Sequence, residues 1–196
     1  MDAQTFADMA KQKYNRIPVS REVLADLDTP LSSYLKLANG KYSYLFESVQ
    51  GGEKWGRYSI IGLPCKTVLK VNGFTATIES RGEEIERHEL EDPLAFVEEF
   101  QSRYRVPELE ELPAFSGGLV GYFGYDAVRY VEKRLRDGAP KDMLGTPDIL
   151  LMVSDEMLVF DNLSGTIKII IHVDPSIDEA YQKAQSRLDE LAAQLS

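Results

Sequence analysis

The stretch YSYLFESVQGGEKWGRYSIIG, residues 42–62, contains the pattern from which the fold can be inferred. It opens on an alternating segment and ends on the apolar pair Ile60-Ile61, and both patterns are typical of β-strands. Between them, the pair Gly51-Gly52 predicts a turn. Two strands joined in this way bring the polar pair Glu47-Ser48 close to the segment Arg57–Ser59.

The polar ends of this strand pair bring together the groups that a zwitterionic ligand needs. A carboxylate suits an ammonium group, hydroxyls suit a carboxylate, and aromatic walls suit a ring. These groups come from Glu47, Ser48, Arg57, Tyr58 and Ser59. An aromatic amino acid would fit such a site, whereas the alternative interpretation is a strand pair whose polar ends simply face water.

The same stretch resembles the Leu-Glu-Ser feedback site in the N-terminal region of anthranilate synthase component I, a family of chorismate-using enzymes of tryptophan synthesis. The family commonly has Leu-Leu-Glu-Ser, where this chain has LFES at residues 45–48. The runs RYSIIG at 57–62 and GGLVGYFGYD at 117–126 also resemble the family, and the similarity extends over most of residues 13–172. The resemblance implies that tryptophan is bound by Phe46, Glu47, Ser48, Arg57, Tyr58 and Ser59.

The composition places limits on the class of protein. A chain of 196 residues can bury one substantial core or two small ones. The net charge of −10 argues against binding to nucleic acid and to anionic membranes. The single cysteine, Cys65, excludes an intrachain disulfide, fits a reducing compartment and is interpreted as an inert structural thiol. Because there is no apolar signal core and no long apolar run, we expect a cytoplasmic protein.

Sequence patterns predict a series of short β-strands and five helices. Helices are expected at residues 2–13, from Thr29-Pro30 to Asn39-Gly40, at 93–105 and at 126–135, with a last one near the C-terminus. Strands are expected at residues 42–46, 60–61, 67–71, 74–78, 84–88, 114–123, 149–153, 157–160 and 166–173, with 19–24 as an edge strand or extended segment. Hairpins without strict alternation of strands and helices indicate an α+β fold. The resemblance implies antiparallel, sandwich-like sheets flanked by helices.

The last helix has its own signals. Ser176 and Glu179 match a capping box at its start. Apolar residues then follow at alternating spacings of four and three, which resembles a coiled-coil seam: Ile177, Tyr181, Ala184, Leu188, Leu191 and Leu195. The pattern covers fewer than three heptads, so packing on the domain or on a missing partner is the favoured interpretation.

No pattern in the chain indicates catalysis or metal binding. His88 and His172 lie in predicted strands without a Cys, Asp or Glu at metal-ligand spacing. The glycine-rich run at residues 117–124 matches neither a P-loop nor a dinucleotide fingerprint. We interpret it as a strand that another backbone approaches closely. No catalytic residue and no metal ligand is therefore predicted in this chain.

The resemblance also implies what is missing. Full-length relatives are much longer, and their chorismate pocket, Mg2+-binding glutamates and catalytic histidine lie in the C-terminal half. Residues 1–196 are therefore expected to be one N-terminal region that carries the feedback site and is inactive alone. The whole enzyme would convert chorismate and ammonia to anthranilate and pyruvate with Mg2+.

Three partners are implied for this region: L-tryptophan as feedback inhibitor, the glutamine amidotransferase component II, and the C-terminal catalytic half of the same protein. Two alternatives stay open. Aminodeoxychorismate synthase component I shares the fold and can retain a similar tryptophan pocket. A stand-alone amino-acid-binding regulatory module would bind tryptophan without any partner domain.

Overall fold

The structure is a computed structural model that describes residues 1–48, 56–136 and 143–195. The chain divides into two compact units. The first unit comprises Met1–Cys65, Tyr104–Gly118 and Ser154–Ser196, and the second comprises Lys66–Arg103 and Leu119–Val153. The turn predicted at Gly51-Gly52 lies outside the described residues.

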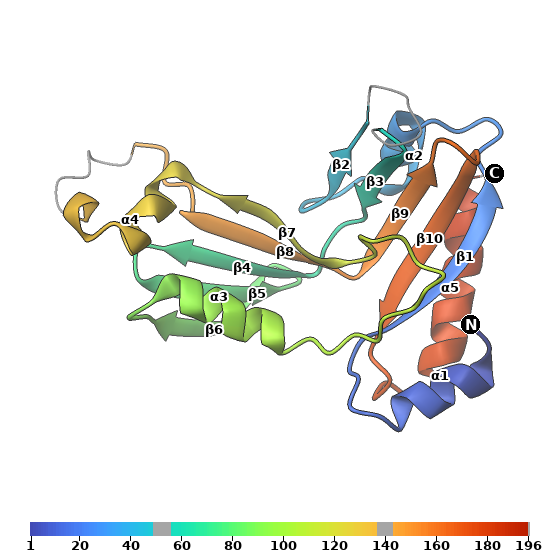
Figure 1. The fold of residues 1–196 in the computed structure, drawn as a ribbon, viewed down its shortest axis with the longest axis horizontal. Coiled ribbons are helices and arrows are strands. Elements are labelled where there is room, and N and C mark those ends of the chain that lie inside the picture. The colour runs from blue at the N-terminus through green and yellow to red at the C-terminus, as the bar shows by residue number, and fades with distance from the viewer. Residues whose placement is uncertain (49–55, 137–142, 196) are drawn as a thin grey trace. The chain divides into compact units, whose positions relative to one another are not determined.

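The first unit is built on a sheet in which five strands are described (Figure 1). In their order across the sheet they are β1 (Ile17–Leu24), β10 (Thr166–Val173), β9 (Glu156–Asp161), β3 (Tyr58–Gly62) and β2 (Tyr44–Phe46). Neighbouring strands run antiparallel throughout. Strand β1 forms one edge of the sheet, as the sequence suggested, and the short strand β2 forms the other.

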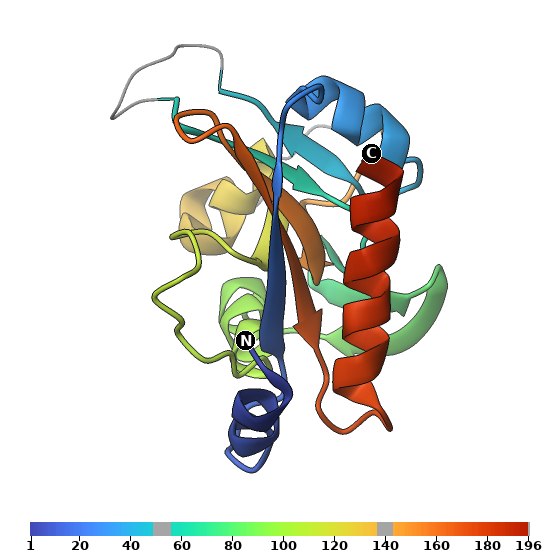
Figure 2. The ribbon, with the colours of Figure 1, turned by 90° about the vertical axis from the view of Figure 1, so that its right-hand side faces the viewer.

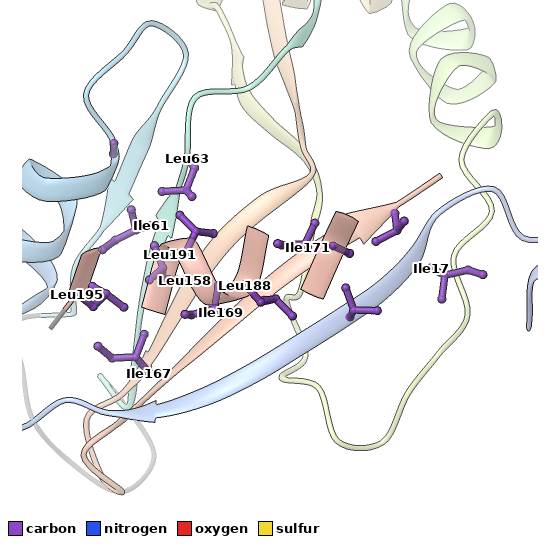
Figure 3. Close-up of a cluster of buried hydrophobic side chains, with 14 of the residues drawn as sticks. Ile17, Ile61, Leu63, Leu158, Ile167, Ile169, Ile171, Leu188, Leu191 and Leu195 are labelled. Carbon is purple, nitrogen blue, oxygen red and sulfur yellow. The ribbon is translucent and has the colours of Figure 1, made fainter. Parts of the chain in front are cut away.

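Helix α5 (Ala180–Leu195) covers one face of this sheet (Figure 2), and a hydrophobic core fills the space between them. Every second residue of β10 points into this core, and α5 contributes apolar residues at spacings of three and four. Figure 3 shows these side chains meeting, among them Ile167, Ile169, Ile171, Leu188, Leu191 and Leu195. The last helix therefore packs on its own domain, which was one of the two favoured interpretations.

Two shorter helices complete the first unit, α1 (Ala3–Ala10) and α2 (Pro30–Leu37). Helix α1 ends three residues earlier than predicted. Helix α2 begins at the predicted position, where Thr29 and Ser32 form a capping box: the Ser32 N–H donates to Thr29 Oγ1 at 3.1 Å, and the Thr29 N–H donates to Ser32 Oγ at 2.9 Å. The helix-start signal at Thr29-Pro30 is thus confirmed.

The second unit contains the other sheet. Its described strands, in order, are β6 (Glu83–Glu89), β5 (Thr75–Ser80), β4 (Thr67–Asn72), β8 (Ile149–Ser154) and β7 (Gly118–Phe123). The Asn72-Gly73 signal is confirmed, because β4 and β5 pair as an antiparallel hairpin and Gly73 has a positive φ of 55°. The Asp148 carboxylate accepts a hydrogen bond from the Gly73 N–H at 2.7 Å and so holds the hairpin turn.

Helix α3 (Pro93–Ser102) of the second unit begins as predicted, with Asp92 accepting backbone N–H groups of the first turn. The single helix predicted at residues 126–135 is wrong: it is divided into α4 (Val128–Val131) and two flanking 3-10 turns, Tyr125–Ala127 and Lys133–Leu135. With antiparallel sheets and flanking helices in the described residues, the α+β fold class is confirmed.

The capping box predicted for the last helix is wrong. The helix begins at Ala180, and Glu179 lies outside it in the left-handed region with φ 54°. The Ser176 hydroxyl donates to Asp174 Oδ1 at 2.6 Å, and the Ser176 N–H donates to the same oxygen at 2.9 Å. A turn organised by Asp174 therefore replaces the expected helix start, because a local side-chain acceptor competes with helical capping.

The glycine-rich run at residues 117–124 has the packing role that was inferred from its sequence. A Cβ atom on Gly121 of β7 would lie 1.9 Å from the backbone oxygen of Leu150 on the neighbouring strand β8. The strand itself begins at Gly118, four residues later than predicted, because Gly117 and Gly118 have positive φ values of 144° and 128°.

The core under α5 makes a quantitative prediction. Leu188 is fully buried against the sheet. Replacing it with alanine should reduce the free energy of unfolding by about 2–5 kcal/mol, because the change removes buried methyl groups and leaves a cavity. Urea denaturation checks this. Ser186→Ala, at an exposed position of the same helix, is the matched control and should change the value by less than about 0.5 kcal/mol. Equal stabilities for the two variants would contradict the described core.

Candidate functional site

The ends of β2 and β3 bring three residues of the predicted binding site together. The register pairs Phe46 with Ile60, so the residues after β2 lie beside the start of β3. The Ser48 hydroxyl donates to the carbonyl oxygen of Tyr58 at 2.8 Å, and the Ser48 N–H donates to Ser59 Oγ at 3.2 Å. The adjacency inferred from the sequence is therefore present, and two hydrogen bonds maintain it.

The two faces of the sheet separate the aromatic residues of this set from Ser59. Ser59 is fully buried and, by strand alternation, points to the same side as Ile61 in the core under α5. Tyr58 and Phe46 point to the opposite face, and the two residues are 38% and 53% exposed. Two partly exposed rings therefore share one face, while the Ser59 hydroxyl lies on the other and accepts from the Ser48 backbone.

The segment that leaves β2 presents an aromatic ring and then a carboxylate. The Phe46 ring packs beside the buried Tyr44 ring, with centroids 5.1 Å apart. Glu47 comes next and is exposed. Its carboxylate forms no hydrogen bond or ion pair with any residue that the structure describes. Of the predicted residues, Glu47 is thus the one whose charge stays available to a ligand.

Arg57, in contrast, is already paired. Its Nε donates to Asp161 Oδ1 at 2.9 Å and its Nη2 donates to Asp161 Oδ2 at 2.5 Å, a bidentate geometry. The guanidinium also lies 4.8 Å from the centre of the Tyr58 ring. The hydrogen bonds from Arg57 lower the pKa of Asp161 to about 2. Arg57 therefore joins the start of β3 to the turn between β9 and β10.

Asn162, which lies in the turn between β9 and β10, also belongs to this environment. Its backbone N–H donates to the Arg57 carbonyl oxygen at 2.8 Å, and its side-chain amide lies 3.2 Å from the Gly56 carbonyl oxygen and 3.4 Å from Ser59 Oγ. No signal in the sequence could have placed it here, because about 100 residues separate it from β3. Asn162 and Asp161 together support the Arg57–Ser59 segment.

A cavity of about 410 Å³ lies in the first unit and includes Arg57 and Tyr58 in its lining. The residues that line it are Glu22, Arg57, Tyr58, Glu110, Glu111, Leu112, Pro113, Val159, Asp161, Ser164, Thr166 and Lys168. Its second cation, Lys168, donates to the Glu111 carbonyl oxygen at 2.7 Å and lies 3.6 Å from Glu22 Oε2. Both cations are thus paired, and the lining has more carboxylates than cations. Such a cavity favours a ligand with a positively charged group over an anion.

The remaining reactive side chains have structural roles. Burial raises the pKa of the Cys65 thiol to about 12, which keeps it in the unreactive neutral form. Burial lowers the pKa of His172, whose Nε2 donates to the Ser116 carbonyl oxygen at 2.6 Å. His88 pairs with Glu86 at 2.9 Å on the surface of β6.

Within the described ranges, no three His, Cys, Asp or Glu residues are grouped to hold a metal ion, and no helix has the length and apolar character to cross a membrane.

The ion pair between Arg57 and Asp161 predicts a dependence on pH. Because its pKa is lower in the folded state, ionised Asp161 contributes stability at pH values above about 4, and that contribution is lost as the pH falls from about 4 to about 2. Asp161→Asn keeps a side-chain oxygen that can accept hydrogen bonds from the backbone of the turn between β9 and β10, and it removes the negative charge. It should reduce the free energy of unfolding at pH 7 by about 1 kcal/mol.

The measurement is urea denaturation of the parent and Asp161→Asn at pH 7 and near pH 2.5. The difference between them should shrink at the lower pH. Asp8→Asn, which removes the charge from an exposed pair with Lys11, is the matched control and should leave stability almost unchanged at both pH values. A difference for Asp161→Asn that is the same at both pH values would contradict the assignment.

Comparison with known proteins gives consistent results. No protein-family model matches the chain. Over 195 residues it is 61% identical to "Anthranilate synthase component 1" of Pseudomonas aeruginosa, covering 100% of this chain and 40% of that protein. It is 51% identical over 195 residues to the protein of the same name from Neisseria meningitidis serogroup B, covering 98% of this chain and 40% of that protein. A solved structure, anthranilate synthase component I from Streptococcus pneumoniae TIGR4, matches with a TM-score of 0.52 and 26% identity, covering 87% of this chain and 36% of that chain.

The chain thus spans about 40% of the length of the curated relatives that it matches. The matched part of each relative is its N-terminal portion. The motifs LFES, RYSIIG and GGLVGYFGYD had suggested the same family, and the α+β fold agrees with the solved relative. The chain therefore belongs to the anthranilate synthase component I family, in which it corresponds to the N-terminal region of the longer relatives.

Proposed function

We propose that this chain is the N-terminal, tryptophan-sensing portion of an anthranilate synthase. The whole enzyme would convert chorismate and ammonia to anthranilate and pyruvate, with ammonia released from glutamine by a component II partner. The observation that carries the proposal is the match of the entire chain to the N-terminal part of proteins named anthranilate synthase component 1. The interpretation of residues 1–196 as one regulatory and scaffold region rests on the same observation.

In this proposal, tryptophan binds where β2 ends. Glu47 is exposed, and no described residue pairs with its carboxylate, which would bind the ligand ammonium group. The exposed rings of Phe46 and Tyr58 offer an apolar surface for the indole. The Ser48 hydroxyl, which donates to the Tyr58 carbonyl oxygen, can still accept a hydrogen bond from the ligand.

Arg57 and Ser59 have supporting roles in this proposal. Arg57 uses two of its N–H groups on Asp161, and Ser59 is buried and accepts from the Ser48 N–H. They would hold the strands in place while Phe46, Glu47 and Ser48 make the direct contacts. The partly exposed side chain of Arg57 also lines the neighbouring cavity.

The catalytic groups are proposed to lie in the C-terminal portion of the full-length protein. The described residues offer no cluster of side chains that fits Mg2+, so no step that depends on this ion is assigned to them. The contribution of this chain would be regulation and scaffolding. Aminodeoxychorismate synthase component I is the alternative enzyme, but the names of the relatives that match this chain favour the first assignment. A stand-alone amino-acid-binding module is the alternative without catalysis.

The proposed tryptophan site predicts the effect of added bulk at Ser48. In the full-length enzyme, Ser48→Phe should raise the tryptophan concentration for half-maximal inhibition at least tenfold, because the ring would fill the space beside Glu47. Turnover without tryptophan should change little, since the inhibitor site is separate from the catalytic site. Anthranilate fluorescence measures both quantities.

Ser186→Phe places the same ring at an exposed position of α5 and serves as the control for bulk alone. Tryptophan should inhibit this variant at the same concentrations at which it inhibits the parent. If the curves for Ser48→Phe and the parent coincide while the parent is inhibited, the assignment of Ser48 is wrong. A parent that produces anthranilate but ignores tryptophan would refute the feedback role and leave the enzyme assignment intact.

The proposed location of the catalytic groups makes a further prediction. The 196-residue chain alone should produce no anthranilate from chorismate, ammonium and Mg2+, whereas the full-length protein should produce it. The assay is product fluorescence, with heat-inactivated protein as the background. Turnover by the chain alone above this background would refute the location of the catalytic groups. Formation of aminodeoxychorismate in place of anthranilate by the full-length protein would favour the alternative enzyme.

A further inference from the structure

Strand β2, which leads into the proposed binding segment, has few backbone contacts to hold it. It consists only of residues 44–46 and lies at the edge of its sheet, where it pairs with β3 on one side. A three-residue edge strand shares few ladder hydrogen bonds with its neighbour. Side-chain contacts must therefore contribute to the position of Glu47 and Ser48, which follow directly.

Tyr44 supplies such contacts. It is opposite Gly62 in the register, and its ring occupies the space that any side chain at position 62 would need: a Cβ there would lie 1.9 Å from Tyr44 Cε1. Gly62 has an ordinary negative φ, so packing and not backbone conformation accounts for the glycine. The glycine thus forms a slot that receives the Tyr44 ring.

A buried hydrogen bond closes the far end of this slot. The Tyr44 hydroxyl lies 2.7 Å from Ser154 Oγ, and the two residues are only 8% and 1% exposed. Ser154 ends β8 and is separated from the start of β9 by a single residue. The bond therefore attaches β2 to a point 110 residues away in the chain. The same bond gives each of the two hydroxyl groups a hydrogen-bond partner, and burying either hydroxyl without a partner would cost free energy.

A polar pair fixes position in a way that an apolar contact does not. A phenylalanine would keep the packing in the slot, whereas the tyrosine hydroxyl must also stay near Ser154 to keep its hydrogen bond. The position of the Tyr44 ring is transmitted to Phe46, whose ring packs beside it on the same face of β2. The backbone continues from there into Glu47 and Ser48.

We propose that Tyr44, Gly62 and Ser154 form a positioning cluster that holds the segment Phe46–Ser48 in its ligand-binding geometry. None of the three is assigned a contact with the ligand, and their effect is exerted through Phe46 and the backbone of β2. The ligand itself rests on the proposed function, in which this segment binds L-tryptophan. The position of the segment is a separate property that can be measured without any ligand.

The experiment compares the full-length protein with three variants of it: Tyr44→Phe, Ser154→Ala and the double variant. Each single variant leaves a buried hydroxyl without its partner, so it should lose both stability and affinity. The double variant removes both hydroxyls and should recover most of the stability. It still lacks the directional bond, so its affinity for L-tryptophan in calorimetry should stay about fivefold below the parent, the factor that one net hydrogen bond is worth.

Ser33→Ala is the matched control. Ser33 is also a fully buried serine of the first unit, and its hydroxyl has no hydrogen-bond partner among the described residues. Its removal should leave the affinity at the parental value. If the double variant also binds like the parent, the hydroxyl pair has only a structural role and the proposal is overturned.

Hydrogen exchange of the backbone amides tests the positioning without tryptophan. The Ser48 N–H, which donates to Ser59 Oγ, should exchange about fivefold faster in the double variant, while the amides of β10 should be unchanged. If the parent binds no tryptophan, the proposed function fails and the exchange of the Ser48 amide alone decides the positioning. An unchanged exchange rate at Ser48 would then overturn it.

Discussion

The burial of apolar side chains between α5 and the sheet of the first unit is the contact on which the rest of that unit depends. Alternate isoleucines of β10 meet leucines that are spaced three and four apart on α5. This contact specifies the register, because a shift of one residue would turn every buried side chain of a strand to the other face. It therefore determines which side of β3 is buried and, in turn, where the polar residues next to it can lie.

The proposed binding segment lies at the margin of this rigid arrangement. The central strands are held on both sides, whereas β2 pairs with a single strand among the described residues and spans only three residues. Polar interactions take over where the core stops: Arg57 with Asp161, Ser48 with Tyr58 and Ser59, and Tyr44 with Ser154. These interactions are directional, so they can hold a ligand-binding geometry at an edge that hydrophobic burial alone would leave poorly defined.

Arg57 shows that a charged residue of a local motif can have its partner in a distant part of the chain. Its sequence position beside Tyr58 and Ser59 suggested a direct role in ligand binding. In the fold its guanidinium meets Asp161, which lies 104 residues away, and two of its N–H groups donate to that carboxylate. Glu47 has the opposite situation, since it is exposed and its carboxylate has no partner among the described residues. The availability of a charge depends on distant residues that no local pattern reveals.

The sequence by itself determined the α+β class, the hairpin at Asn72-Gly73, the helix start at Thr29-Pro30 and the adjacency of Ser48 to Tyr58 and Ser59. These features depend on alternation, turn residues and caps, which act between residues close in the chain. Only the tertiary structure decided that Ser59 points into the core, that Asn162 supports β3, and that a turn held by Asp174 replaces the expected cap of α5. Those outcomes depend on which distant segments meet and which of several possible acceptors lies within hydrogen-bonding distance, and this is settled only when the whole chain packs.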